Sequence, residues 1–71
     1  MNTDLRIIRI REAVVLTTLT RSTIYKKLRS DKTFPRPVPL SDSNSRGAPV
    51  GFVLSEVLAW IESRIEKREG R

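Results

Sequence analysis

Two residue types that carry much of protein chemistry are missing from this 71-residue sequence, which contains no cysteine and no histidine. Without them the chain forms no disulfides, and a structural zinc site lacks its usual ligands. The same absences remove the commonest pairs of catalytic nucleophile and base, and the chain has no glycine-rich phosphate loop. Its acids are scattered, or spaced for an exposed helix face like Glu62 and Glu66. We therefore predict no enzyme activity and no metal, cofactor or small-molecule substrate.

Long apolar runs are also missing, since no segment approaches the roughly 20 consecutive apolar residues that cross a membrane. The opening stretch MNTDLRIIRIRE interrupts its apolar residues with charges, so it lacks the core of a secretion signal. We expect a cytoplasmic protein with no membrane partner. Its length and its hydrophobic content of 38% suit a single small domain over residues 1–71. A domain of this size has little room for a deep catalytic cavity.

Positive charge, in contrast, is abundant: 14 lysine and arginine residues against 8 acids give a formal net charge of +6. Residues 1–46 hold ten basic and four acidic side chains, whereas residues 47–71 hold four of each. The whole excess therefore lies in the first two thirds of the chain. Such a one-sided distribution is typical of a protein that binds a polyanion. A solvated basic surface without a partner is the alternative.

Two neighbouring segments have the spacing of amphipathic helices. Over residues 10–17, apolar or small residues recur at i, i+3, i+4 and i+7. Over residues 21–29, Ile24 and Leu28 stand one turn apart and face inward. Because only a short link separates the two helices, they must pack at an angle, as in a helix-turn-helix over about residues 10–30.

Proline and glycine then shape a hairpin over about residues 34–54. Prolines at positions 35, 37 and 39 exclude a helix and favour extended chain at a sheet edge. The stretch SDSNSRGAP is typical of a turn, and VGFVL has the composition of a strand. These features predict two strands joined by a polar loop.

A last helix is predicted over about residues 56–67, with Ser55 as its N-cap. Its apolar stripe comprises Val57, Leu58, Ile61 and Ile65. Trp60 flanks this stripe, so we expect it to pack in the core and not to stack on a base.

The predicted order of helix, turn, helix, hairpin and helix is a winged helix-turn-helix, mainly α with a small β-hairpin. The sequence also resembles the AlpA-like regulators of prophages and related mobile elements, whose relatives include phage excisionases and MerR-type DNA-binding domains. The resemblance lies in IIRIREAVVLTTLTRSTIYKKL, FPRPVPL and VGFVLSEVLAWIESRI, which cover almost the whole chain. It implies a bacterial DNA-binding regulator of transcription. One departure is Thr18, because such proteins usually carry glycine in the turn, where a positive φ is costly for threonine.

Helical phase and this resemblance together select the candidate DNA-binding side chains. With Ile24 and Leu28 inward, Ser22, Lys26 and Arg29 point outward. In a winged helix the start of this helix enters the major groove, where arginine and lysine donate to guanine. The predicted DNA-binding residues are Arg21, Ser22, Thr23, Tyr25, Lys26, Lys27 and Arg29 on the helix, and Arg36 and Arg46 in the hairpin.

These residues have different expected roles. By resemblance, Arg21, Ser22, Thr23 and Lys26 are the candidates for the groove. Lys27 and Arg29 are better suited to phosphates or solvent, because they lie farther from the start of the helix. Tyr25 either packs its ring against Phe34 or Pro35 or bonds a phosphate with its hydroxyl. Arg46 stands beside Gly47 at the predicted wing tip, and Arg36 at the wing base is the second choice.

Three functions remain open. The resemblance implies a sequence-specific regulator that binds double-stranded DNA and controls an integrase gene. The same surface would serve an excision factor that bends DNA beside an attachment site and assists an integrase. A protein-binding adaptor would need a large exposed apolar patch, which the sequence does not indicate. We also expect cooperative self-association on DNA, through Val15 or the last helix.

Overall fold

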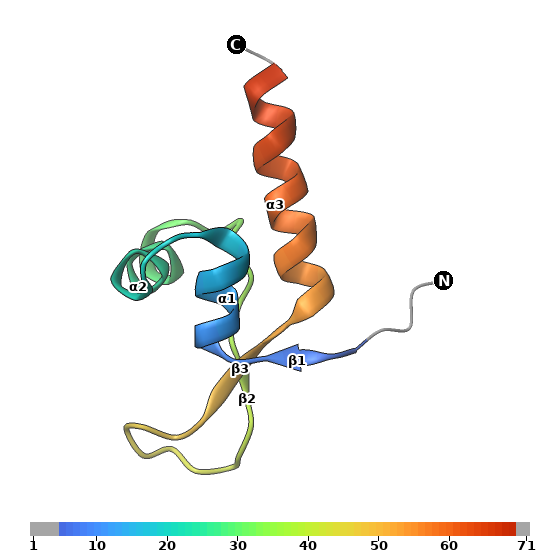
Figure 1. Cartoon of the computed structure of the whole chain (residues 1–71). Helices are drawn as coiled ribbons and strands as arrows, with labels where there is room; N and C mark the ends of the chain where they lie inside the picture. Colours follow the sequence, from blue (N-terminus) through green and yellow to red (C-terminus); the bar gives the residue numbers. More distant parts are fainter. Residues whose placement is uncertain (1–4, 70–71) are drawn as a thin grey trace.

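The computed structural model describes residues 5–69 and arranges them as three helices around a small antiparallel sheet (Figure 1). In chain order the elements are β1 (Ile7–Ile8), α1 (Ile10–Thr17), α2 (Arg21–Ser30), β2 (Val38–Pro39), β3 (Val50–Val53) and α3 (Leu54–Glu69). The mainly α fold class with a helix-turn-helix and a hairpin wing is confirmed. None of the helices within these residues has the length and apolar character that a membrane crossing requires.

The turn between α1 and α2 uses a backbone conformation that favours glycine. Thr18 ends α1 with φ 62° and ψ 8°, in the left-handed region. Its N–H donates to the carbonyl of Val14 at 2.8 Å, and the N–H of Leu19 donates to Thr17 Oγ1 at 3.2 Å. Hydrogen bonds therefore hold the turn in a conformation that is strained for threonine.

The sheet contains one strand more than the sequence indicates. β3 is the central strand and pairs antiparallel with both β1 and β2. β1 was not predicted, because two isoleucines between charged residues carry no alternating pattern long enough to indicate a strand. At Gly51 a Cβ would lie 2.9 Å from the carbonyl oxygen of Ile8, so the missing side chain allows β1 and β3 to approach.

The core lies where α1, α2 and α3 meet the sheet. It is formed by Ile8, Ala13, Ile24, Phe34, Phe52, Val57 and Trp60. The Phe34 ring packs edge-on against Trp60, with 4.9 Å between ring centroids, and is also edge-on to Phe52. Trp60 is 9% exposed, which confirms the expected packing role and excludes it as a base-stacking platform.

Two expectations for the last helix were wrong. α3 begins at Leu54 directly after β3, so Ser55 lies inside the helix and is not its N-cap. The N–H of Leu54 instead donates to the carbonyl of Arg6 at 2.8 Å, which continues the sheet pairing into the helix. The predicted stripe is also divided: Val57 is buried, whereas Leu58 and Ile65 are 43% and 46% exposed. The direct junction with β3 turns the side of the helix that carries Val57 toward the core.

Candidate nucleic-acid interface

A cluster of hydroxyl groups surrounds the start of α2. Thr20 Oγ1 accepts the N–H of Thr23 at 3.2 Å and donates to Thr23 Oγ1 at 2.9 Å, which makes Thr20 the N-cap. Ser22 Oγ lies 3.3 Å from Thr20 Oγ1 and is exposed. The free N–H groups and the dipole of a helix start favour a negative group such as a phosphate. The local geometry therefore suits contact with a nucleic-acid backbone.

The outward face of α2 presents basic side chains that the protein itself does not engage. Arg21, Lys26 and Arg29 are exposed, and no hydrogen bond or ion pair within residues 5–69 uses their side chains. Tyr25 is 45% exposed, so part of its side chain is accessible. These positions agree with the phase deduced from Ile24, which is fully buried.

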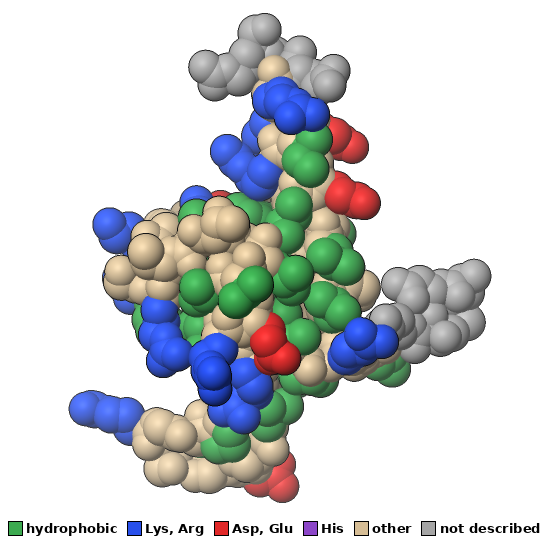
Figure 2. Space-filling model, viewed as in Figure 1, with side chains coloured by type: hydrophobic (Ala, Val, Ile, Leu, Met, Phe, Trp, Pro, Cys, Tyr) green, Lys and Arg blue, Asp and Glu red, His purple; other side chains and the backbone are tan. Residues whose placement is uncertain are grey.

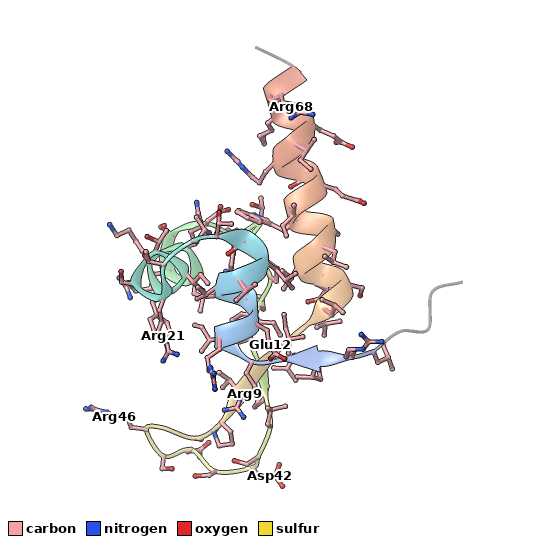
Figure 3. All side chains as sticks on the ribbon, in the orientation of Figure 1. Arg9, Glu12, Arg21, Asp42, Arg46 and Arg68 are labelled. Atoms are coloured by element: carbon pink, nitrogen blue, oxygen red, sulfur yellow. The ribbon has the colours of Figure 1, made fainter. Side chains whose placement is uncertain are left out.

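The wing carries Arg46 to the same side of the molecule. It lies in the turn beside Gly47, which has φ 87°. In Figure 3, Arg21 points from α2 toward the wing, Arg46 extends from the wing loop, and Arg9 lies below α1 near the strands of the hairpin. Within the described part of the chain the Arg46 side chain has no partner. The helix and the wing thus form two sides of one basic surface.

Two arginines at the start of α1 join this surface and were missed from the sequence. Arg9 Nε donates to the carbonyl of Val50 at 3.1 Å, which ties α1 to β3. Arg11 is exposed, and the two arginines line a surface hollow together with Glu12 and Val15. Figure 2 shows blue side chains continuing from α2 across this region toward the wing. Both residues belong to the excess of basic side chains in residues 1–46. Only the tertiary structure shows that the start of α1, which carries them, lies beside β3 of the wing.

The side-chain nitrogens of Arg36, at the base of the wing, bind backbone carbonyls. Nη1 donates to Leu28 at 2.8 Å, Nη2 to Asp31 at 3.1 Å and Nε to Phe34 at 3.2 Å. Arginine near a helix end commonly satisfies the last carbonyls in this way. Arg36 therefore ties the end of α2 to the segment leading into the wing, and its contact with DNA stays a prediction.

Lys27 also turns away from the outward face. Its Nζ lies 3.9 Å from Asp31 Oδ2 and 5.7 Å from the centre of the Trp60 ring. Arg64 of α3 lies over the same ring at 5.9 Å. The ammonium of Lys27 thus lies beside Asp31 and the Trp60 ring of α3, and its expected contact with phosphate or solvent stays a prediction.

Asp31 holds its negative charge at the end of α2. Hydrogen bonds from the Thr33 hydroxyl at 2.6 Å and the Thr33 N–H at 2.9 Å lower the pKa of its carboxyl below the ordinary value of 3.8. Burial opposes this shift, whereas the positive charges of Lys27 and Arg64 add to it. The ionised carboxylate therefore stays available to Lys27.

Two of the comparisons with known proteins found a match. A family model described as "Prophage CP4-57 regulatory protein (AlpA)" matches residues 6–65, from β1 into α3. "Uncharacterized protein ORF88" of Enterobacteria phage P4 is 39% identical to this chain over 67 residues, which are 94% of this chain and 69% of that protein. No solved structure matches the chain.

Proposed function

Since the chain belongs to the AlpA family of prophage regulatory proteins, we propose that it regulates transcription by binding double-stranded DNA with α2 and the wing. One observation carries this proposal: Arg21, Lys26, Arg29 and Arg46 are exposed and unpaired within residues 5–69. A polyanion satisfies such a set of charges, and duplex DNA offers a groove that accepts a helix.

The parts of this surface have distinct proposed roles. Arg21 and Lys26 contact base edges in the major groove, and the hydroxyls of Ser22 and Thr23 contact phosphates or bases. Arg29, Arg11 and the Tyr25 hydroxyl contact phosphates, which set the position of the protein on the duplex. Arg46 lies in the minor groove or along the backbone. We do not assign Lys27 and Arg36 to this surface, because Lys27 lies beside Asp31 and Arg36 donates to backbone carbonyls.

Salt dependence of binding tests the DNA contact. Each neutralised phosphate changes the slope of log K against log salt by about 0.9, so about 3 to 5 contacts per protomer give slopes of about −2.7 to −4.5. Arg46→Ala should make the slope less negative by about 0.9. Lys67→Ala is the matched control, because Lys67 is exposed near the end of α3 that lies away from the wing (Figure 1). A binding constant that does not change with salt concentration would contradict the proposal.

The reading of bases by α2 has its own test. Duplexes are selected from a random pool with the wild type and with Lys26→Ala, and the base preferences are compared. We expect Lys26→Ala to lose the preference for one base at a single position of the duplex, since a good base contact contributes about 1–3 kcal/mol of discrimination between bases. Lys32→Ala, which removes an exposed charge from the loop after α2, should leave the preference unchanged. An unaltered preference in Lys26→Ala would remove Lys26 from the groove.

The position of the binding site decides between two uses of this surface. We propose that the site lies in the promoter region of an integrase gene, so footprinting should show protection there. Protection confined to an attachment site, together with loss of excision when the protein is deleted, would instead identify an excision factor that assists the integrase. A single module buries only about 600–1,000 Å² on DNA. We therefore propose that several copies bind adjacent sites cooperatively.

A further inference from the structure

A row of apolar side chains on α3 lies outside the core. Leu58 and Ile65 are 43% and 46% exposed, and Ile61 between them is half-buried. Successive residues of a helix are rotated by about 100° around its axis. The row therefore lies about 90° around α3 from Val57 and Trp60, which pack in the core. The upper turns of α3 extend beyond α1 and α2 (Figure 1). The outer part of the row is therefore accessible to another molecule.

Charges of opposite sign border this row. By helical phase, Arg64 and Arg68 lie on one side and Glu62 and Glu66 on the other. Figure 2 shows the same arrangement along the upper part of α3, where green side chains separate blue from red. Arg64 is held over the Trp60 ring, and no hydrogen bond or ion pair within residues 5–69 engages Glu62 or Glu66. One flank of the row is thus basic and the other acidic.

A groove between α3 and the turn after α1 continues the apolar surface. Its lining includes the apolar Leu16, Leu19, Ile61 and Ile65 and the basic Arg64 and Arg68. Leu16 is 39% exposed. The row and the groove therefore form one surface, which we call the α3 face.

We propose that the α3 face pairs with the α3 face of a second copy of this chain, with the two α3 helices parallel. Two parallel helices related by a twofold axis along their length place the basic flank of each copy beside the acidic flank of the other. An antiparallel pair would place Arg64 near Arg64 and Glu62 near Glu62, and like charges repel. The alternating spacing of three and four along Leu58, Ile61 and Ile65 is that of a helix–helix seam in either orientation, so the charges alone select the parallel pair.

The pairing is weak in free solution, because the α3 face is short. Stable interfaces bury about 800 Å² on each partner, and three apolar residues with a groove cover much less. Neighbours on one duplex have an effective concentration of about 1 mM, at which weak pairing is sufficient. A twofold axis along α3 also keeps both wings at the same end of the pair, since α3 points away from the wing (Figure 1). This last consequence rests on the proposed DNA binding, whereas the pairing itself does not.

Cross-linking of the full chain tests the proposal without DNA. Because the chain has no cysteine, Ile65→Cys introduces a single thiol. In the parallel pair the two copies of residue 65 face each other across the axis, within reach of a disulfide. At about 1 mM, Ile65→Cys should form covalent dimer about tenfold faster than Val15→Cys, an exposed control on α1. Glu62→Arg added to Ile65→Cys should slow the reaction.

Three outcomes would overturn the pairing. Equal rates for Ile65→Cys and Val15→Cys would mean random collision, and a faster rate for Val15→Cys would place self-association on α1. Faster linkage in a mixture of Leu58→Cys and Ile65→Cys than in either alone would mean an antiparallel pair. Circular dichroism checks that each variant is folded. Failure here leaves the salt dependence of DNA binding as a separate result, so the two proposals are distinguishable.

Discussion

Replacing Arg36 should lower the stability of the protein and leave its DNA contacts in place. The guanidinium donates to three carbonyls, of Leu28, Asp31 and Phe34, at 2.8 to 3.2 Å. In Arg36→Ala, the end of α2 loses these donors and the link to the chain that enters the wing. A basic residue that contacts phosphate would behave in the opposite way, with little effect on stability and a change in salt dependence.

The expected magnitude follows from the exposure of the site. A hydrogen bond from a charged donor contributes about 1.5–3 kcal/mol when well shielded. Because Arg36 is exposed and water can replace part of each bond, we expect a total loss of about 1–2 kcal/mol. A domain of this size retains only about 3–5 kcal/mol of net stability. At about 4–8 °C for each kcal/mol, Tm should fall by about 5–15 °C.

Thermal unfolding by circular dichroism and a salt series with duplex DNA test this together. Arg36→Lys is the matched control: it keeps the charge but loses the planar fork, so it should lose stability as well. Both variants should keep the wild-type salt slope when measured below Tm. The reasoning is refuted if Arg36→Ala unfolds at the wild-type temperature, or if its salt slope becomes less negative by about 0.9.

We predict the effect on stability of three further substitutions, two at positions with special backbone geometry and one at a carboxylate. Thr18→Gly should raise stability by about 0.5–1 kcal/mol in urea unfolding, since φ is 62° there; a decrease would show that the lost hydrogen bond from Thr18 Oγ1 to the carbonyl of Thr17 outweighs the strain. Gly51→Ala should destabilise by more than about 2 kcal/mol, because the new Cβ would crowd β1; an unchanged Tm would contradict this close approach. The lowered pKa of Asp31 stabilises the folded state above the ordinary value of 3.8, and this contribution disappears as pH falls through the lower folded value. Asp31→Asn should therefore show a smaller loss of stability on acidification than the wild type, and equal pH profiles would exclude this role.

Helices α1 and α2 could be predicted because the spacing of their apolar residues is a local signal. The spacing of Ile24 and Leu28 is enough to set the phase of α2, and Lys26 is accordingly exposed. The turn at Thr18 was also expected from the family pattern. For α3, by contrast, the apolar residues cover too wide an arc to show which of them face the core. Only the direct junction with β3 selects Val57 and Trp60 and leaves Ile65 exposed.

The sequence by itself determined the charge, the order of the three helices and the hairpin, and the face of α2 that meets solvent, because composition and helical periodicity depend on neighbouring residues alone. The tertiary structure decided which charges are available. Arg36 and Lys27 look like any other cation in the sequence, yet backbone carbonyls and Asp31 engage them. Arg11 joins the basic surface only because the sheet brings α1 beside the wing. Contacts between residues that are distant in the chain cannot be predicted from the local spacing of residue types.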